Sequence, residues 1–300
     1  MLQSLTPIVW ILGMACCSGP AQEIGVPLSE EEFQASGPVQ HDDFVVNAIP
    51  KCGTHLIMNC LHWMLNKSVD EGYDYVTEEQ YTPDVARKYS AFIQSLKGKP
   101  FIHKTHVPFF QNMENTFLEA GMKWIFCIRD PRDAVVSLVF YLENRFGDQR
   151  DFMSIDSAIY DPLTIDQKIE AVLTGSCCTN YMATYLKPFV GWTKSSQGLT
   201  IRFEDLIGPQ GGGQRDSQIQ AIKQIASYLH VTLSEQEIRR IAVHTNSFPT
   251  PIVQNALGTS YTLGQTGNWR LFFNDANKNL FKELFGTELI QLGYEPNGHW

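Results

Sequence analysis

The stretch PKCGTHL at residues 50–56 has the residue types of an anion-binding turn. It follows the apolar run FVVNAI at 44–49 and leads into a run with helical periodicity, so a strand, a tight turn and a helix are expected in that order. Gly53 permits close approach to the backbone, and free N–H groups at the start of a helix attract negative charge. Lys51 and Thr54 add a cation and a hydroxyl, which suits a phosphate or a sulfonate. Taken alone, the stretch could also be an ordinary strand–turn–helix corner.

Two further stretches place basic groups where an apolar run ends. In HKTHVP at 103–108, Lys104 and His106 alternate onto one side of an extended chain. A lysine beside a histidine can combine charge stabilisation with a general base, because imidazole titrates near neutral pH. Arg129 follows another apolar run and Ser137 lies about two helical turns further on, so this pair could hold a second phosphate. Each stretch by itself also allows a purely structural role.

The elements that must position these residues alternate between strands and helices. Runs rich in valine, isoleucine and phenylalanine predict strands at 44–49, 100–103, 124–128 and 199–203. Apolar periodicity, an Asp-Pro start and two capping boxes predict helices at 56–65, 132–142, 169–173 and 238–244. Strands spaced by helices indicate a parallel sheet, whose ligands bind at the carboxyl ends of the strands. The predicted class is α/β: a single domain with a central parallel sheet flanked by helices and a P-loop-like strand–loop–helix.

Composition narrows the classes of function. The chain has 300 residues, of which 43% are hydrophobic, enough for one large core or two modest ones. The net charge of −9 argues against nucleic-acid binding, so a phosphate must be held by a few local cations. The seven cysteines form no CxxC, and neither a disulfide framework nor a metal site is indicated.

Residues 9–15 are apolar but too short to span a bilayer, and no lysine or arginine precedes them. Residues 1–24 are interpreted as an N-terminal arm, with a signal or lipoprotein leader as the alternative.

Taken together, the three stretches occur in the order found in a known family. The chain resembles the sulfotransferases that use 3′-phosphoadenosine-5′-phosphosulfate (PAPS), most closely their cytosolic branch, which acts on aryl, alcohol and steroid acceptors. That family reads PKSGTTW, KTHLP and R-[ND]-P-[RK]-D-x-x-x-S where this chain reads PKCGTHL, KTHVP and RDPRDAVVS. GVPL at 25–28, FEDL at 203–206 and GQTGNWR at 264–270 also resemble family motifs. The resemblance defines a sulfotransferase domain at 25–295 and a C-terminal tail at 296–300.

The resemblance implies which residues bind PAPS. The 5′-phosphosulfate would be held by the residues of the first turn: Lys51, Cys52, Gly53, Thr54 and His55. The 3′-phosphate would be bound by two side chains and one backbone segment: Arg129, Ser137 and the chain near Gly264. The adenine would contact two residues that match the family's TSF segment: Asn246 and Phe248.

The resemblance also implies the catalytic residues. His106 would be the base that takes a proton from an acceptor hydroxyl or amine. Lys51 and Lys104 would neutralise charge on the sulfonyl and leaving phosphate oxygens during in-line transfer. Positioning and electrostatics would carry most of the catalysis, as in phosphoryl transfer, and no metal would be needed.

Some residues depart from the family pattern. Leu56 stands where the cytosolic enzymes have a tryptophan that stacks on adenine, and Thr262-Leu263 stand where Arg-Lys is usual. Residues 270–276 lack the dimer motif KxxxTVxxxE, so a family-like dimer is not expected. Aromatic side chains near the motifs could line an apolar acceptor pocket or pack in the core: Phe109, Phe110, Phe140, Tyr141 and Phe146.

Several functions remain open at this point. The preferred one is a PAPS-dependent sulfotransferase acting on a small-molecule hydroxyl or amine in the cytoplasm. The alternatives are a catalytically impaired nucleotide-binding homologue, and a sulfotransferase for carbohydrate or protein acceptors that is exported through a cleaved leader at 1–24. A P-loop kinase or hydrolase is disfavoured, because GxxxxGK[ST] and an acidic Mg²⁺ site are missing from the sequence.

Overall fold

The computed structural model describes residues 39–74, 82–144, 155–176, 186–246, 252–254, 260–262 and 264–300. The predicted N-terminal arm or leader lies outside these ranges, as do Phe146, Phe248 and Leu263.

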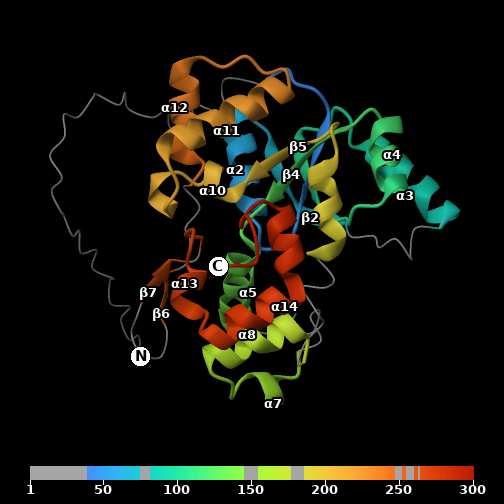
Figure 1. Cartoon of the computed structure of the whole chain (residues 1–300). Helices are drawn as coiled ribbons and strands as arrows, with labels where there is room; N and C mark the ends of the chain where they lie inside the picture. Colours follow the sequence, from blue (N-terminus) through green and yellow to red (C-terminus); the bar gives the residue numbers. More distant parts are fainter. Residues whose placement is uncertain are drawn as a thin grey trace, which may run out of the picture.

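Five parallel strands form the central sheet, in the order β2-β3-β1-β4-β5 (Figure 1). The strands are β1 (Phe44–Ala48), β2 (Ser68–Asp74), β3 (Phe101–Thr105), β4 (Lys123–Ile128) and β5 (Leu199–Arg202). The predicted α/β class with a central parallel sheet is therefore confirmed. Strand β2 was not predicted, because its sequence SVDEGYD is rich in residues that are depleted from strands.

Two helices begin at the predicted signals and carry the first and third motifs. Helix α2 (Thr54–Leu65) starts directly after Gly53. Helix α5 (Pro131–Asn144) starts at its proline, and the carboxylate of Asp130 accepts a hydrogen bond of 3.0 Å from the backbone N–H of Arg132. Both helices therefore point their N-termini toward the carboxyl ends of β1 and β4, which is the geometry that favours bound anions.

The predicted capping boxes are also present. Helix α8 (Ile165–Thr174) is capped by Thr164, and helix α12 (Glu235–His244) is capped by Ser234, each with its reciprocal side chain three residues later. The remaining elements are α3 (Pro83–Ser95), α4 (Gln111–Glu119), α7 (Ser157–Tyr160), the 3₁₀ helices η1 (Lys187–Lys194) and η2 (Pro209–Gly211), α10 (Phe203–Leu206), α11 (Arg215–Tyr228), the antiparallel pair β6 (Ile252–Gln254) and β7 (Ser260–Thr262), α13 (Trp269–Phe272) and α14 (Asp275–Gln291).

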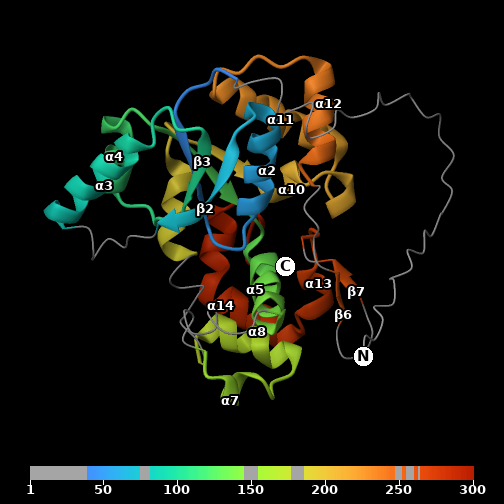
Figure 2. The same ribbon diagram turned by 180° about the vertical axis from the view of Figure 1, so that it is seen from behind.

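Alternate strand residues face two separate cores. In β4, Trp124 and Phe126 belong to one apolar cluster, while Ile125 and Cys127 belong to the other. The first cluster includes residues of α3, α4, α5, α8 and α14, and the second includes residues of α2, α11 and α12 (Figures 1 and 2). Helices thus cover both faces of the sheet, which explains why the central strands read as continuous apolar runs.

The C-terminal residues return to the domain. The ring of Trp300 lies 5.7 Å from that of Trp269 and 6.1 Å from that of Phe281, centroid to centroid. The segment predicted as a tail at 296–300 therefore ends against α13 and α14.

Candidate active site

The turn after β1 requires glycine at residue 53. Its φ is 100°, in the left-handed region, and a Cβ at this position would lie 2.6 Å from a ring carbon of Phe203. The preceding Lys51 also has a positive φ of 65°, and the N–H of Cys52 donates to the carbonyl of Ile49 at 3.0 Å. The turn thus has a fixed conformation that leads the chain into α2.

The thiol of Cys52 faces the core and takes no part in the turn's chemistry. The residue is 1% exposed, and burial raises the pKa of its thiol to about 12. Its carbonyl accepts a hydrogen bond of 3.1 Å from the thiol of Cys127, which is also fully buried. Only the backbone of Cys52 can therefore serve an anion.

The cations expected in the first two motifs lie at neighbouring strands. The ammonium of Lys51 lies 3.6 Å from the centroid of the Tyr141 ring on α5. Lys104 is buried on β3, in register with Val46 of β1. His55, in contrast, is exposed on the first turn of α2.

The histidine of the second motif is oriented by β1. His106 Nδ1 lies 2.6 Å from the carbonyl oxygen of Ala48. A carbonyl can only accept, so Nδ1 carries the proton and the lone pair of the neutral ring is on Nε2. The next residue, Val107, is hydrogen-bonded to the side chain of Asn47 through both its N–H and its carbonyl. Asn47 was not singled out from the sequence, although an asparagine inside the run FVVNAI is a signal that could have identified it.

The arginine of the third motif connects two distant loops. Arg129 is 3% exposed, and it donates to the carbonyls of Gln265 at 2.8 Å and Lys51 at 3.5 Å. Its guanidinium carbon lies 4.3 Å from the centroid of the Phe203 ring, so the group stacks on that ring. Its Nε is buried and has no hydrogen-bond partner among the residues that the structure places. The carboxylate of Asp133, four residues further on, accepts from the backbone N–H groups of Gly267 and Trp269.

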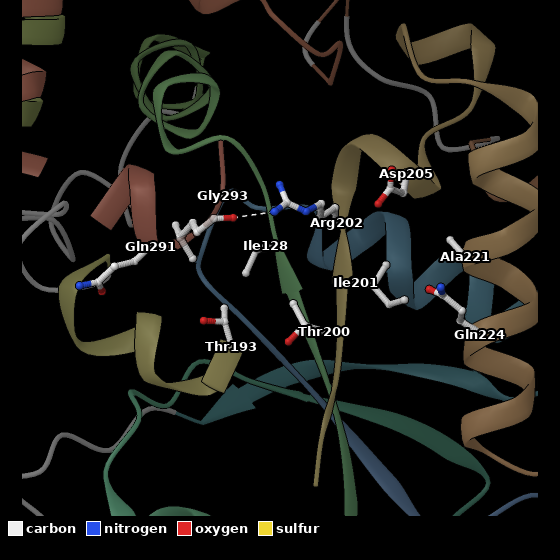
Figure 3. Close-up of a pocket in the computed structure, with 11 residues that line it drawn as sticks. Ile128, Thr193, Thr200, Ile201, Arg202, Asp205, Ala221, Gln224, Gln291 and Gly293 are labelled. Carbon is white, nitrogen blue, oxygen red and sulfur yellow. Dashed lines mark hydrogen bonds between the residues drawn. The ribbon is translucent and has the colours of Figure 1, made fainter. Parts of the chain in front are cut away.

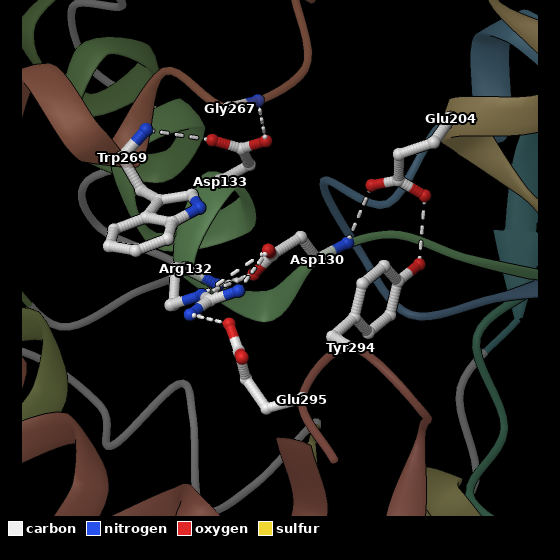
Figure 4. A network of polar contacts seen from close by, with 8 residues as sticks. All are labelled: Asp130, Arg132, Asp133, Glu204, Gly267, Trp269, Tyr294 and Glu295. Carbon is white, nitrogen blue, oxygen red and sulfur yellow. Dashed lines mark hydrogen bonds and ion pairs between the residues drawn. The ribbon is translucent and has the colours of Figure 1, made fainter. Parts of the chain in front are cut away.

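A buried polar network begins at the next residue, Asp130, and links the start of α5 to α10 and to the C-terminal segment (Figure 4). Arg132 forms ion pairs of 2.7 Å with Asp130 and with Glu295. Glu204 accepts hydrogen bonds of 2.8 Å from the backbone N–H of Asp130 and from the hydroxyl of Tyr294. Burial raises the pKa of Glu204 above its ordinary value. The network fixes the start of α5 against α10 and the C-terminal segment.

The remaining predicted binding residues come from α5, from the end of α12 and from the C-terminal loop. Ser137 is half-buried on α5. Asn246 follows α12, whose end is held to α2 by Asn59, which donates to the carbonyls of His244 at 2.6 Å and Thr245 at 2.9 Å. Gly264, with φ of 104°, begins the segment that meets Arg129.

The structure thus gathers three motif residues at one edge of the sheet. Lys51, His106 and Arg129 follow the carboxyl ends of β1, β3 and β4, which are neighbours in the sheet. Leu56, at the position of the family's stacking tryptophan, lies in the first turn of α2 and is 7% exposed. Its side chain packs in the apolar core between α2 and the sheet.

A hollow of about 390 Å³ lies elsewhere, along the edge strand β5 (Figure 3). It shares none of the predicted site residues. Its cation, Arg202, is bound within the fold, since it donates to the carbonyl of Leu292 at 2.6 Å and stacks on Tyr294 at 4.5 Å. We therefore assign the site from the three loops, where cations and a histidine converge, and not from this hollow.

The described residues include neither a metal site nor a membrane-spanning helix. Within those ranges, histidine, cysteine, aspartate and glutamate form no group of three or more that could hold a metal ion. Within the same ranges, every helix is too short or too polar to cross a membrane.

Comparison with known proteins gives the family. The sulfotransferase domain family matches residues 41–293. The chain is 26% identical over 285 residues to sulfotransferase 6B1 of Pan troglodytes, covering 89% of this chain and 85% of that protein. It is 21% identical to sulfotransferase 1A1 of Bos taurus, covering 90% and 93%.

Solved structures show the same fold. Mouse sulfotransferase SULT7A1 complexed with PAP is 18% identical with a TM-score of 0.53, covering 91% of this chain and 95% of that one. Retinol dehydratase in complex with androsterone and inactive cofactor PAP is 17% identical with a TM-score of 0.51, covering 82% and 80%. Because the family match covers well over half of the chain, the protein belongs to the sulfotransferase family, as its three loops predicted.

Proposed function

We propose that this protein transfers the sulfonate group of PAPS to a hydroxyl or amine of a small-molecule acceptor, with His106 as the base. The observation that carries the proposal is the 2.6 Å hydrogen bond between His106 Nδ1 and the carbonyl of Ala48. It leaves Nε2 as the proton acceptor of a neutral ring. Ala48 is the last residue of β1, and Lys51 lies three residues later, so the strand that holds the base also leads into the turn that carries the cation of the first motif.

The residues of the site fit PAPS. The ring of Phe203 occupies the place where a Cβ of residue 53 would lie, so the turn keeps glycine there, and a phosphosulfate would approach its backbone at a residue without a side chain. Arg129 keeps a buried Nε without a partner in the placed part of the chain, as expected for an anion site. The PAP-bound structures of SULT7A1 and retinol dehydratase support the same nucleotide. The contacts would come from the residues named for each part of PAPS: Lys51 to His55, Arg129, Ser137, Gly264, Asn246 and Phe248.

The reaction assigns one task to each catalytic side chain. When bound, PAPS supplies the sulfonate, whose bond to the 5′-phosphate breaks as its bond to the acceptor forms. His106 Nε2 takes the proton of the attacking O–H or N–H. Lys51 and Lys104 stabilise negative charge on the sulfonyl and leaving phosphate oxygens, which gives in-line transfer without a metal ion.

The acceptor is expected to be a small apolar alcohol or amine. The ring of Tyr141 places aromatic surface next to the ammonium of Lys51, at the entrance expected for the acceptor. Structures of retinol dehydratase hold androsterone in one case and retinol in another. Both compounds are therefore reasonable first acceptors to try.

A transfer assay tests the proposal. PAPS labelled in its sulfonate is incubated with androsterone, retinol, a simple phenol and a simple aryl amine, with and without a metal chelator. We expect label on at least one acceptor irrespective of the chelator. The variant His106→Gln should lower this rate by about 10²–10⁴-fold and leave PAP affinity within about threefold. PAP binding without transfer to acceptors of any class would favour the impaired homologue, and absence of PAP binding would overturn the proposal.

A further inference from the structure

The side chain of Asn47 extends the pairing between β1 and β3. Its Oδ1 accepts from the N–H of Val107 at 3.1 Å, and its Nδ2 donates to the carbonyl of Val107 at 3.0 Å. The backbone of Asn47 is already in register with Thr105, the last residue of β3. The amide side chain therefore acts as an additional peptide group, which pairs with a residue beyond the end of the strand.

This contact is buried and specific in orientation. Asn47 and Val107 are both 0% exposed. The Val107 carbonyl also accepts from the indole N–H of Trp192 at 2.9 Å. Because the N–H of Val107 needs an acceptor and its carbonyl needs a donor, only one orientation of the amide satisfies both groups.

The neighbouring residue pair holds the imidazole. Ala48 follows Asn47 in β1, and His106 precedes Val107 in the loop; His106 Nδ1 bonds to the Ala48 carbonyl at 2.6 Å. Two consecutive residues of β1 thus hold two consecutive residues of the second loop. The same strand runs directly into the turn that carries Lys51.

We propose that Asn47 is a positioning residue that sets the place and the tautomer of His106. The inference rests on the proposed function, in which His106 is the base. Without the Asn47 amide, Val107 would lose the partner of its N–H and one of two donors to its carbonyl, and the loop would shift from β1. The bond from His106 Nδ1 to Ala48 would then weaken, and Nε2 would no longer be the fixed lone-pair site. A misplacement of about 1 Å at a reacting group can cost on the order of 100-fold in rate.

The test uses two variants and a matched control. Asn47→Leu keeps the side-chain volume and removes both hydrogen bonds, and Asn47→Asp keeps the acceptor but loses the donor. The control is Asn277→Leu, because Asn277 is also a buried amide, 3% exposed, which donates to the carbonyl of Asp166 at 3.1 Å between α14 and α8. Thermal unfolding identifies the variants that remain folded.

Three measurements distinguish positioning from a general loss of stability. The ring-nitrogen shifts of ¹⁵N-labelled histidine at pH 8, assigned with His106→Gln, report the tautomer without any ligand. Calorimetry with PAP reports nucleotide affinity. Label transfer from PAPS to the acceptor found in the screen reports turnover, or label release to water if none is found.

We expect the wild type and Asn277→Leu to show His106 protonated at Nδ1. In the Asn47 variants this signature should be lost and turnover should fall by about 10- to 100-fold, with PAP affinity within about threefold. Unchanged histidine shifts and turnover in a folded Asn47 variant would overturn the inference. If neither variant folds, amide hydrogen exchange of the wild type still tests the inference. A Val107 amide that exchanges with solvent as fast as the amides of an open loop would contradict the inference. Failure of PAP to bind the wild type would instead count against the proposed function and leave the tautomer result to stand on its own.

Discussion

The guanidinium of Arg129 donates a 2.8 Å hydrogen bond from Nη2 to the backbone carbonyl of Gln265, across a separation of 136 residues. The contact is supported by the first turn of α5, where Asp133 accepts from the N–H groups of Gly267 at 2.7 Å and Trp269 at 2.8 Å. The start of α5 therefore holds the C-terminal loop in place. The proposed site for the 3′-phosphate is built from these two segments together.

The conformation of the first turn predicts a severe effect of Gly53→Ala. A methyl group would meet Phe203 at 2.6 Å on a backbone with φ of 100°. We expect the free energy of unfolding in urea to fall by about 1–3 kcal/mol and PAP affinity to fall at least about tenfold. The matched control is Gly286→Ala in α14, where the new methyl group meets nothing within 4 Å among the described residues apart from its chain neighbours and the backbone of its own helix. That change should stabilise the protein by about 0.5–1 kcal/mol. Equal stability of Gly53→Ala and wild type would show that the turn has another geometry.

The burial of Cys52 predicts an unreactive thiol. With a pKa of about 12, it remains protonated at neutral pH and is shielded from reagents. Iodoacetamide at pH 7.5 should leave Cys52 unmodified in the native protein and modify it after unfolding, as mapped by mass spectrometry. Since only the backbone faces an anion, Cys52→Ser should bind PAP within about threefold of wild type. Rapid alkylation of the native thiol would contradict the structure of this turn.

The fold was predictable where signals are local, and less so where contacts are distant. The start of α5 could be predicted because Asp130 and Pro131 are adjacent cap residues, and the capping boxes of α8 and α12 are likewise read from four-residue windows. Strand β5 was predicted one residue too long, because Phe203 has strong strand propensity but begins α10. Tertiary packing decided that boundary.

In the candidate site, too, local features could be predicted from the sequence and contacts between distant segments could not. The three loops could be located from their residue types and from the order of strands. The bond from Arg129 to Gln265 and the clamp from Asn47 to Val107 could not, because each joins segments that only the folded sheet brings together. The core position of Leu56 likewise depends on which face of α2 packs against the sheet.

The raised pKa of Glu204 predicts how stability varies with pH. Burial is the main cause, so the folded protein holds this proton to a higher pH than the unfolded chain, whose value is near 4.5. The stability associated with the protonated carboxyl is complete below that value and is lost as pH rises through the folded pKa. Glu204→Gln removes this loss. The free energy of unfolding of the variant minus that of wild type should therefore rise with pH above 4.5 and then level off. Parallel stability curves would contradict the assignment.

The contact between Lys51 and Tyr141 predicts a difference between two substitutions. Tyr141→Phe keeps an aromatic ring beneath the ammonium, and Tyr141→Leu removes it. A cation–π contact is worth about 0.5–2 kcal/mol, so the leucine variant should bind PAP about 2- to 30-fold more weakly, while the phenylalanine variant should match wild type. Calorimetry measures the PAP affinity of both variants and of the wild type. Tighter binding by the leucine variant would show that Tyr141 competes with the nucleotide for Lys51.

The most direct test of the proposed sulfonate donor is calorimetric binding of PAP to wild type, Arg129→Ala and Arg202→Ala. The two arginines are matched, since each donates to a backbone carbonyl and stacks on an aromatic ring, but Arg202 lies outside the proposed site. We predict micromolar affinity for wild type, about −8 kcal/mol, retained in Arg202→Ala and reduced at least about 100-fold in Arg129→Ala. Absence of binding to wild type, or equal binding by both variants, would contradict the account.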